Sequence, residues 1–240
     1  MNIYDNQSFF DSYGSMARSS GLEMAGEWYV LKPLLPDFKG KKVLDIGCGY
    51  GWHCKYAAEN GAEYVKGVDG SEKMIAEAQK RNADGKIEYA VADIETMEMG
   101  TEEYDAVVSN LVLHYIENLK PVYEKVYRAL KKGGVFVFNI EHPVFTAGVN
   151  EDWVYGEDGK AKYWPVDGYY YPGERETVFL GHKVKKQHHT LTQILMGLLE
   201  TGFEITAVKE PAPAADMMHI EGMADEMRRP MMLIVRAEKR

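Results

Sequence analysis

Three aspartates stand where predicted buried strands end, and a glycine-rich turn follows the first. Glycines at 47, 49 and 51 let the backbone bend tightly and approach a ligand closely. Asp69 comes twenty residues after Gly49, where a carboxylate can accept hydrogen bonds from both hydroxyls of a ribose. Asp93 could accept one from an exocyclic amine. Because parallel strands end at one edge of a sheet, Asp45, Asp69 and Asp93 together predict a nucleoside site.

Taken singly, each aspartate also fits an ordinary turn or a cap on the glycine loop. Three at successive strand ends beside a GxGxG turn favour the ligand site over that alternative. A dinucleotide-binding turn would place its third glycine at Trp52, so the GxGxxG pattern is not met. This disfavours a nicotinamide-dependent oxidoreductase.

Two of the seven histidines are candidates for accepting a proton during catalysis. His142 follows the predicted strand 135–140, and Pro143 holds its backbone extended, so we expect it to face a second-substrate pocket. His114 comes four residues after Asn110 and could flank the same pocket. For both histidines, a hydrogen-bonded structural role is the alternative.

The remaining histidines predict no further chemistry. His53 is expected to pack on the helix after the glycine turn. His188 and His189 are adjacent, so a regular strand cannot turn both toward one site. With Lys183, Lys185 and Lys186 nearby, we expect them to form an exposed basic edge. No Asp, Glu and His cluster has the spacing of metal ligands, so no metal site is expected.

Strands and helices alternate between residues 41 and 140, which predicts an α/β fold with an open parallel sheet covered by helices. The predicted strands of this part are 42–46, 64–68, 87–92, 104–109 and 135–140, and its predicted helices are 52–60, one capped by Ser71, and 118–131. A helix at 191–201 then precedes strands 203–208 and 232–237, which we expect to pair antiparallel at the sheet edge.

Residues 141–189 interrupt the alternation and are predicted to cover the carboxyl edge of the sheet. Their aromatic-rich stretch 153–171 fits either a lid over a planar, apolar or cationic molecule or the core of a small β-subdomain. A strand-like segment follows at 176–185. Six methionines lie between Met217 and Met232, in a segment that we expect to have helical character. They fit an adaptable binding surface, packing under the lid or a contact between subunits.

Composition narrows the classes of partner. The chain has 240 residues and a formal charge of −9, which opposes an encounter with phosphate backbones and favours a small-molecule partner over nucleic acid. No apolar run approaches the roughly 20 residues of a membrane helix. The first residues do not resemble a secretory signal, and Cys48 and Cys54 fit free thiols. We therefore expect a soluble, cytoplasmic protein without a membrane partner; the oligomeric state stays open.

The chain resembles the class I S-adenosylmethionine-dependent methyltransferases, in particular the small-molecule enzymes of methyltransferase type 11. The segments that carry the resemblance are DIGCGYG at 45–51, GVDGSEKM at 67–74, ADI at 92–94, SNLVLHY at 109–115 and LKKGGVFVF at 130–138. Beyond the core, MARSSGLEMAGEW at 16–28 and EHPVFT at 141–146 resemble a bacterial group whose acceptors are mostly undefined. The resemblance implies a seven-stranded, Rossmann-like sheet, mostly parallel, with an antiparallel C-terminal strand and an inserted lid.

The resemblance also implies roles for single residues around S-adenosylmethionine. Asp45, Gly47 and Gly49 would line its methionine portion, Asp69 its ribose, and Asp93 and Ile94 its adenine. Met74 would pack on the adenine face, beside Gly70, where a larger residue is more usual and a looser pocket is expected. Asn110 and Leu111 would form the floor beside the sulfur. Tyr13 and Arg18 would close over the cofactor, with Arg18 pairing with its carboxylate.

These implications divide the single domain 1–240 into four parts: an N-terminal helical arm at 1–40, a cofactor-binding core at 41–140, an acceptor-side lid at 141–189, and a helix with a strand pair at 190–240. The expected reaction is direct in-line methyl transfer to a small molecule, to oxygen or nitrogen rather than carbon. A cofactor-binding protein without catalysis is the alternative. NPPY-type motifs used to reach amines of nucleic-acid bases are absent after the fourth strand.

Overall fold

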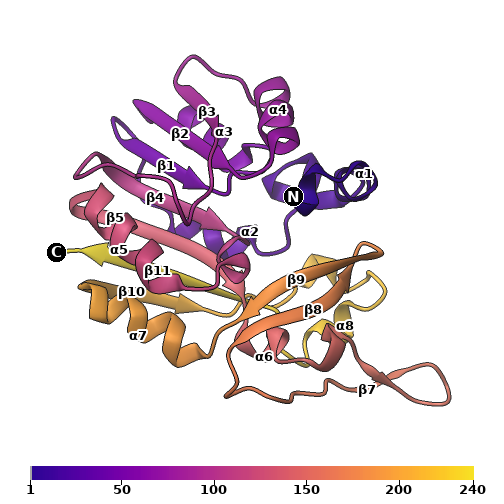
Figure 1. The fold of residues 1–240 in the computed structure, drawn as a ribbon. Coiled ribbons are helices and arrows are strands. Elements are labelled where there is room, and N and C mark those ends of the chain that lie inside the picture. Colours follow the sequence, from indigo (N-terminus) through magenta and orange to yellow (C-terminus); the bar gives the residue numbers. More distant parts are fainter. Residues whose placement is uncertain (1) are drawn as a thin grey trace.

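A seven-stranded sheet forms the centre of the computed structural model, which describes residues 2–240 (Figure 1). In spatial order it runs β10-β11-β5-β4-β1-β2-β3, and β11 alone runs antiparallel to both its neighbours. The strands are β1 (Lys42–Ile46), β2 (Tyr64–Asp69), β3 (Ile87–Val91), β4 (Tyr104–Asn110), β5 (Leu130–Glu141), β10 (Phe203–Lys209) and β11 (Met232–Lys239). The predicted α/β class, with its parallel core and antiparallel C-terminal strand, is confirmed.

One predicted boundary is wrong. The helix expected at 118–131 ends at Ala129, and β5 begins at Leu130 rather than at 135. Leu130 is fully buried and pairs with Tyr104, whereas the next pair is Ala106 with Val135. Residues 131–134 therefore form an excursion within the strand, which the left-handed backbone of Gly133 (φ 78°) permits.

Helices cover both faces of the sheet. The α-helices are α1 (Gln7–Gly14), α2 (Trp28–Leu31), α3 (Trp52–Glu59), α4 (Glu72–Arg81), α5 (Leu119–Ala129), α6 (Pro143–Thr146), α7 (Leu191–Thr201) and α8 (Met223–Glu226). Helices α5 and α7 pack on the face that buries Phe136 and Phe138 of β5. Helices α2 and α3 pack on the opposite face, against Val135, Val137 and Ala106. Because side chains alternate along a strand, neighbouring residues of β5 serve two separate cores.

Short polar signals fix the helix ends. The Ser71 hydroxyl accepts a hydrogen bond of 3.1 Å from the Met74 N–H and so caps α4, as predicted. Thr190 and Gln193 form a reciprocal capping box at the start of α7, and Gly202 ends this helix with a left-handed backbone. The 3-10 helices are η1 (Ile3–Asp5), η2 (Ala17–Ser20), η3 (Leu22–Met24), η4 (Lys32–Leu34), η5 (Leu113–Tyr115), η6 (Val149–Glu151) and η7 (Ala215–Met217).

The segment between β5 and α7 forms two hairpins, β6–β7 and β8–β9. Their strands are β6 (Val154–Tyr155), β7 (Ala161–Tyr163), β8 (Gly173–Phe179) and β9 (His182–His188). The single strand-like segment predicted at 176–185 is therefore two strands. Leu180 and Gly181, both with positive φ (53° and 77°), form the tight turn between them, a backbone that suits a hairpin.

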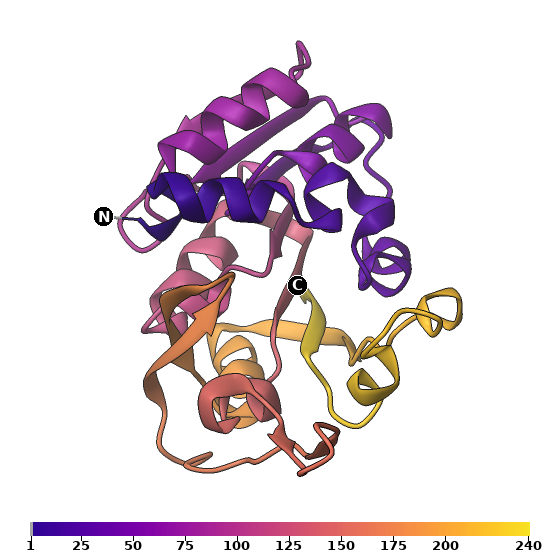
Figure 2. The ribbon, with the colours of Figure 1, turned by 90° about the vertical axis from the view of Figure 1, so that its right-hand side faces the viewer.

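The N-terminal arm and this inserted segment lie at the same end of the sheet (Figures 1 and 2). Phe9 of α1 packs its ring edge-on against Phe179 and His182 at the hairpin tip, with centroid distances of 6.0 and 5.5 Å. The arm and the insertion thus meet across the edge where the parallel strands end. The methionine-rich segment 217–232 holds little helix, only the end of η7 and the four-residue α8.

Truncating Phe136 to Ala should lower the free energy of unfolding by about 3–5 kcal/mol, because the site is fully buried and its ring joins β5 to α5 and β10. Urea denaturation followed by circular dichroism measures this change. Tyr170, 84% exposed, is the control, and its Ala variant should match the wild type. A loss below 1 kcal/mol at Phe136 would contradict this description of the core.

Candidate functional site

The glycine turn after β1 is tied to the end of β2. The N–H groups of Gly47 and Cys48 both donate to the Val68 carbonyl, at 2.7 and 2.9 Å, and the Gly49 N–H donates to Asp69 Oδ2 at 2.9 Å. Glycines 47, 49 and 51 all have positive φ, which explains the residue type at each position. At Gly49 no atom of the residues that the structure describes lies within 4 Å of the place a Cβ would occupy, so the backbone there faces open space.

Asp45 lies beneath this turn and is almost fully buried, with 1% of its surface exposed. The Cys54 thiol of α3 donates to Asp45 Oδ2 at 3.2 Å, while Asp45 Oδ1 has no hydrogen-bond partner among residues 2–240. Burial raises the pKa of Asp45 to about 7. The nearby charge of Asp69 also raises this pKa, whereas the hydrogen bond from Cys54 lowers it. An unsatisfied buried carboxylate oxygen is costly, and a ligand that donates a hydrogen bond would relieve that cost.

Asp69 ends β2 under the N-terminal arm. Its Oδ1 accepts a hydrogen bond from the Ser71 N–H at 2.9 Å, and burial raises its pKa although hydrogen bonds from Ser71 and Gly49 act the other way. Asp5 of the arm accepts from the Ser71 hydroxyl at 2.6 Å and from the Lys73 N–H at 3.2 Å. Sequence reasoning did not find this contact, because η1 has only three residues and no periodic pattern.

Aromatic residues of the arm extend from this point. Tyr4 packs edge-on against Tyr13 at 5.5 Å, and Tyr13 against Tyr50 of the glycine turn at 5.6 Å. Asn2 approaches Gly70, where an added Cβ would lie 3.1 Å from its side-chain nitrogen. The space left by the small residue at Gly70 is thus partly taken by the arm.

The residues assigned to the adenine end lie next along the edge. Met74 and Ile94 are buried, with 2% and 6% of their surfaces exposed. Asp93 is exposed, and its Oδ1 accepts a hydrogen bond of 2.8 Å from the Glu95 N–H. Its turn role and its proposed ligand role are compatible, because a carboxylate has about four acceptor positions.

The ends of β4 and β5 bring a set of amides together. The Asn139 amide donates to Asn110 Oδ1 at 2.9 Å, and the Leu111 N–H donates to the Asn139 carbonyl at 2.8 Å. Leu111 has a positive φ of 58°, a strained backbone for a leucine that this hydrogen bond helps to hold. The Asn110 amide nitrogen also lies 3.2 Å from Glu27 Oε1.

Glu27 is buried and forms an ion pair with Arg18. Sequence reasoning named Arg18 but missed Glu27, although both belong to the segment 16–28 quoted for its resemblance. Beside them, burial lowers the pKa of His53 to about 4, and its buried Nε2 has no partner. His53 packs edge-on against Trp28 at 5.8 Å.

His142 is held by two contacts. Its Nδ1 accepts a hydrogen bond of 3.0 Å from the Val144 N–H and so caps α6, and its Nε2 lies 3.0 Å from Glu210 Oε1. Both ring nitrogens are thereby engaged, which favours the anchoring role over proton transfer. His114 is buried as well, and its Nδ1 lies 3.5 Å from the Glu141 N–H.

The predicted exposed basic edge is only partly correct. Lys183 and Lys185 are exposed and pair with glutamates of β8. Lys186, His188 and His189 are instead buried. Lys186 and His188 lie on the face of β9 that packs on the body of the protein, and His189 follows the strand. His188 lies 2.7 Å from the Thr146 hydroxyl and 2.9 Å from the Tyr169 carbonyl. His188 thus holds parts of the insertion together. His189 Nε2 lies 2.8 Å from the Ile116 carbonyl and so ties the insertion to the segment after β4.

The aromatic stretch of the insertion divides into two groups. Trp164 stacks on Phe145 at 5.2 Å and 16°, Trp153 packs edge-on against it, and the Arg229 guanidinium lies 4.2 Å from its ring centre. Tyr170 and Tyr171 are exposed. The half-buried tryptophans therefore pack on one another and on Phe145, whereas the tyrosines face outward.

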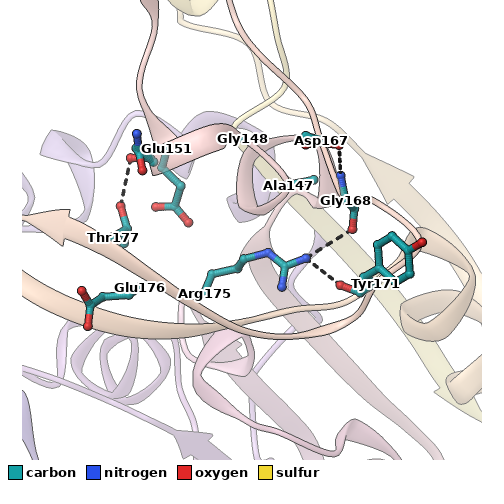
Figure 3. A pocket seen from close by; sticks show the side chains of 10 residues that line it. Ala147, Gly148, Glu151, Asp167, Gly168, Tyr171, Arg175, Glu176 and Thr177 are labelled. Atoms are coloured by element: carbon teal, nitrogen blue, oxygen red, sulfur yellow. Dashed lines mark hydrogen bonds between the residues drawn. The ribbon is translucent and has the colours of Figure 1, made fainter.

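A hollow of about 380 Å³ opens on the insertion (Figure 3). It is separate from the aspartate edge and is lined by three carboxylates, those of Glu151, Asp167 and Glu176. Its arginine, Arg175, donates to backbone carbonyls of Gly168 and Tyr171. Two of the three carboxylates are ion-paired, Glu151 with Lys186 and Glu176 with Lys183.

Two classes of feature are absent from residues 2–240. Among them, no three His, Cys, Asp or Glu side chains gather as they would around a metal ion. Within the same residues, no helix is both long and apolar enough to span a bilayer.

Comparisons with known proteins agree with this geometry. The family described as "Methyltransferase domain" matches residues 44–138. The structure of a Listeria monocytogenes protein assigned to the S-adenosylmethionine-dependent methyltransferases is 46% identical, with a TM-score of 0.87, covering 91% of this chain and 99% of that one. An S-adenosylmethionine-dependent methyltransferase from Mesorhizobium loti is 38% identical, with a TM-score of 0.84, covering 91% of this chain and all of its own.

A malonyl-[acyl-carrier protein] O-methyltransferase of Enterobacter lignolyticus shares 38% identity over 104 residues. That match covers 43% of this chain and 40% of the enzyme. The match thus covers less than half of either protein.

The raised pKa of Asp45 predicts a particular pH dependence of stability. The pKa of this carboxyl group is about 7 in the folded protein and about 3.9 in the unfolded chain. Between these pH values the folded protein binds more protons than the unfolded chain, so the free energy of unfolding falls as pH rises from about 4 to 7. Asp45→Asn carries no charge at any pH. Without ligand, its free energy of unfolding should exceed that of the wild type by up to roughly 4 kcal/mol at pH 8, and the difference should vanish near pH 4.

Asp105→Asn is the matched control. Burial would raise the pKa of Asp105, but hydrogen bonds from the Lys42 N–H and from Lys131 outweigh it and lower the pKa. This variant should therefore lose stability at pH 8. Urea titrations of the three proteins at both pH values measure the differences, and an Asp45→Asn variant less stable than the wild type at pH 8 would refute the assignment.

Proposed function

Because this chain belongs to the S-adenosylmethionine-dependent methyltransferases, we propose that it methylates a nitrogen or oxygen of a small molecule bound between the sheet edge and residues 141–189. Its cofactor is S-adenosylmethionine, which supplies a methyl group already activated by a positively charged sulfur. The protein therefore needs to bind, orient and exclude water rather than to build a nucleophile of its own.

The residues present fit this cofactor. The observation that carries the proposal is the unpartnered Oδ1 of Asp45, buried under a glycine turn whose Gly49 faces open space. In the proposed complex, Asp45, Gly47 and Gly49 hold the methionine portion. Asp69, fixed by its two backbone hydrogen bonds, holds the ribose. The remaining cofactor contacts that we propose are those of Gly70, Met74, Asp93, Ile94, Asn110, Leu111 and Tyr13.

Arg18 is proposed to bind the cofactor carboxylate, as the resemblance implied. Its ion pair with Glu27 uses one nitrogen, Nη2, of a guanidinium that has five N–H donors. Glu27 then acts as a positioning residue, because its carboxylate accepts hydrogen bonds from both the Arg18 guanidinium and the Asn110 amide. We propose it as the site residue that the sequence reasoning omitted.

Two features support a small acceptor. The insertion and the N-terminal arm meet across the sheet edge, where Phe9 packs on Phe179 and His182. The formal charge of −9 opposes a polyanionic partner. A held acceptor gains from in-line placement, worth up to roughly 7–11 kcal/mol in favourable intramolecular reactions.

Replacing Asp69 by Ala should weaken S-adenosylmethionine binding by about 100-fold or more, since two hydrogen bonds to a charged group are each worth about 1.5–3 kcal/mol. Isothermal titration calorimetry with S-adenosylmethionine and with NAD measures the loss and the cofactor preference. Asp105→Ala, at the opposite end of the same sheet, should bind as the wild type does. Unchanged affinity in Asp69→Ala would refute the ribose assignment.

Transfer itself is tested with a donor labelled in its methyl group and a pool of small metabolites as acceptors. Label should enter a low-molecular-weight product and should be absent from added RNA, DNA and protein. Tight cofactor binding without any labelled product would instead support the alternative of a non-catalytic cofactor-binding protein.

A further inference from the structure

Glu141, the last residue of β5, lies on the same side of the sheet as the proposed cofactor contacts. Along β5, Val135 and Val137 face the α2 side, and the alternation continues through Asn139 to Glu141. Asp45 and Asn110 have the same orientation, next to Val43 on β1 and Val108 on β4. His142 follows on the opposite side, at Glu210. The strand therefore presents Glu141, and not His142, on the face of Asn110, two residues beyond Asn139, which pairs with Asn110.

The Glu141 carboxylate belongs to a buried ion cluster. Lys186 of β9 donates to Glu141 Oε1 at 2.6 Å and to Glu151 Oε2 at 2.8 Å. The Lys186 and Glu151 side chains are 4% and 6% exposed, and that of Glu141 is 14% exposed. Glu141 Oε2 and Glu151 Oε1 are buried and have no hydrogen-bond partner in the described structure. Each is a free acceptor that a bound molecule with an N–H or O–H group would satisfy.

Contacts join this cluster to the arm that covers Asp69. His114 lies 3.8 Å from Glu141 through its Nε2, and its ring packs on Tyr115 at 4.4 Å. The Tyr115 hydroxyl lies 3.2 Å from that of Tyr4, which in turn packs against Tyr13. Glu141 thus lies between the proposed cofactor site and the insertion, where we propose that the acceptor is held.

The charges around this space sum to a negative value. Its cations are all paired: Arg18 with Glu27, Lys186 with Glu141 and Glu151, and Arg229 with Glu226. Four carboxylates against three cations leave one excess negative charge, which falls on the Glu141–Glu151–Lys186 cluster, where two carboxylates share one lysine. In the neighbouring hollow, which Glu151 also lines, Asp167 and Glu176 are offset by Arg175 and by the ion pair of Glu176 with Lys183 (Figure 3). A carboxylate or phosphate acceptor would meet repulsion here, whereas an ammonium group would be attracted.

We propose that the acceptor is a small amine and that Glu141 is a catalytic residue that binds its nitrogen and takes up its proton. This inference rests on the proposed function. The acceptor enters as an ammonium ion, attracted by the excess carboxylate, and is deprotonated at Glu141 Oε2. Its nitrogen lone pair then forms the N–CH₃ bond while the C–S bond breaks, and the electrons of that bond stay on sulfur.

The environment suits this role. Burial raises the pKa of Glu141, although the charges of Lys186, Arg18 and Arg229 oppose the rise, so the carboxylate is a stronger base than an exposed glutamate. Burial also lowers the pKa of His114, which keeps this ring neutral beside it. Burial together with the charge of Glu141 raises the pKa of Tyr115 to about 12, so Tyr115 remains a hydroxyl. The groups that face Glu141 are therefore Lys186, Glu151, His114, Tyr115, Arg18 and Arg229.

The first test identifies the charge class of the acceptor. A small-molecule extract is separated by ion exchange into cationic, anionic and neutral fractions at pH 7, and each is incubated with the protein and methyl-labelled S-adenosylmethionine. Label should appear in the cationic fraction. Label confined to the anionic or neutral fraction would overturn the amine while leaving methyl transfer intact, and label in no fraction would overturn the proposed function itself.

The second test uses the labelled cationic fraction as substrate for three variants. Glu141→Gln should lower turnover by about 100- to 10,000-fold, the usual contribution of a tuned base, with S-adenosylmethionine affinity unchanged by calorimetry. Glu210→Gln, the matched control at the His142 pair, should retain full turnover. Glu141→Asp, which keeps a carboxylate, should recover part of the loss.

The pH profile separates a catalytic role from a structural one. Wild-type kcat/KM should fall as pH drops through the raised pKa of Glu141, and this acidic limb should be missing from the residual activity of Glu141→Gln. A Glu141→Gln variant with wild-type turnover, or a larger loss in His142→Ala than in Glu141→Gln, would overturn the assignment of the base to Glu141.

Discussion

The attachment of the glycine turn to the end of β2 is the constraint on which the site depends. Two N–H groups of the turn converge on one carbonyl, that of Val68, and a third reaches the Asp69 side chain. These bonds place the turn over Asp45 and fix Asp69 beside it. If Asp69 were free to rotate, the turn would lose a donor partner and the edge would lose its order. The same carboxylate therefore shapes the backbone and is proposed to bind the ribose.

The buried carboxylates around this turn are unfavourable in the free protein. Asp45 and Glu141 each keep an oxygen without a hydrogen-bond partner, and burial raises the pKa of both. Both lie on one face of the sheet, at opposite sides of Asn110. Such groups cost folding free energy, which a fold retains where a ligand satisfies them. Their positions are consistent with two polar ligands meeting near Asn110, as a methyl transfer between cofactor and acceptor requires.

The sequence predicted the core well because its signals there are local. The glycine turn, the Ser71 cap and the apolar runs of β1 to β4 each depend on residues close together in the chain. The start of β5 was missed because Leu130 pairs with Tyr104, a contact that no local pattern reveals. The interior position of Lys186 and His188 was missed for a related reason. Alternation along a hairpin shows that it has two faces, but which face is buried depends on the part of the protein that packs against it.

The catalytic side shows the same limit more sharply. His142 was a reasonable candidate by residue type and position, because histidine titrates near neutral pH. Its neighbour Glu141 gave no such signal, since an ordinary glutamate is a weak base and is usually solvated. What distinguishes the two is their environment: Glu210 and the Val144 N–H occupy the imidazole, whereas the Glu141 carboxylate is buried with one oxygen free. Burial can therefore make a better base of the glutamate than of the histidine, and only the folded chain reveals it.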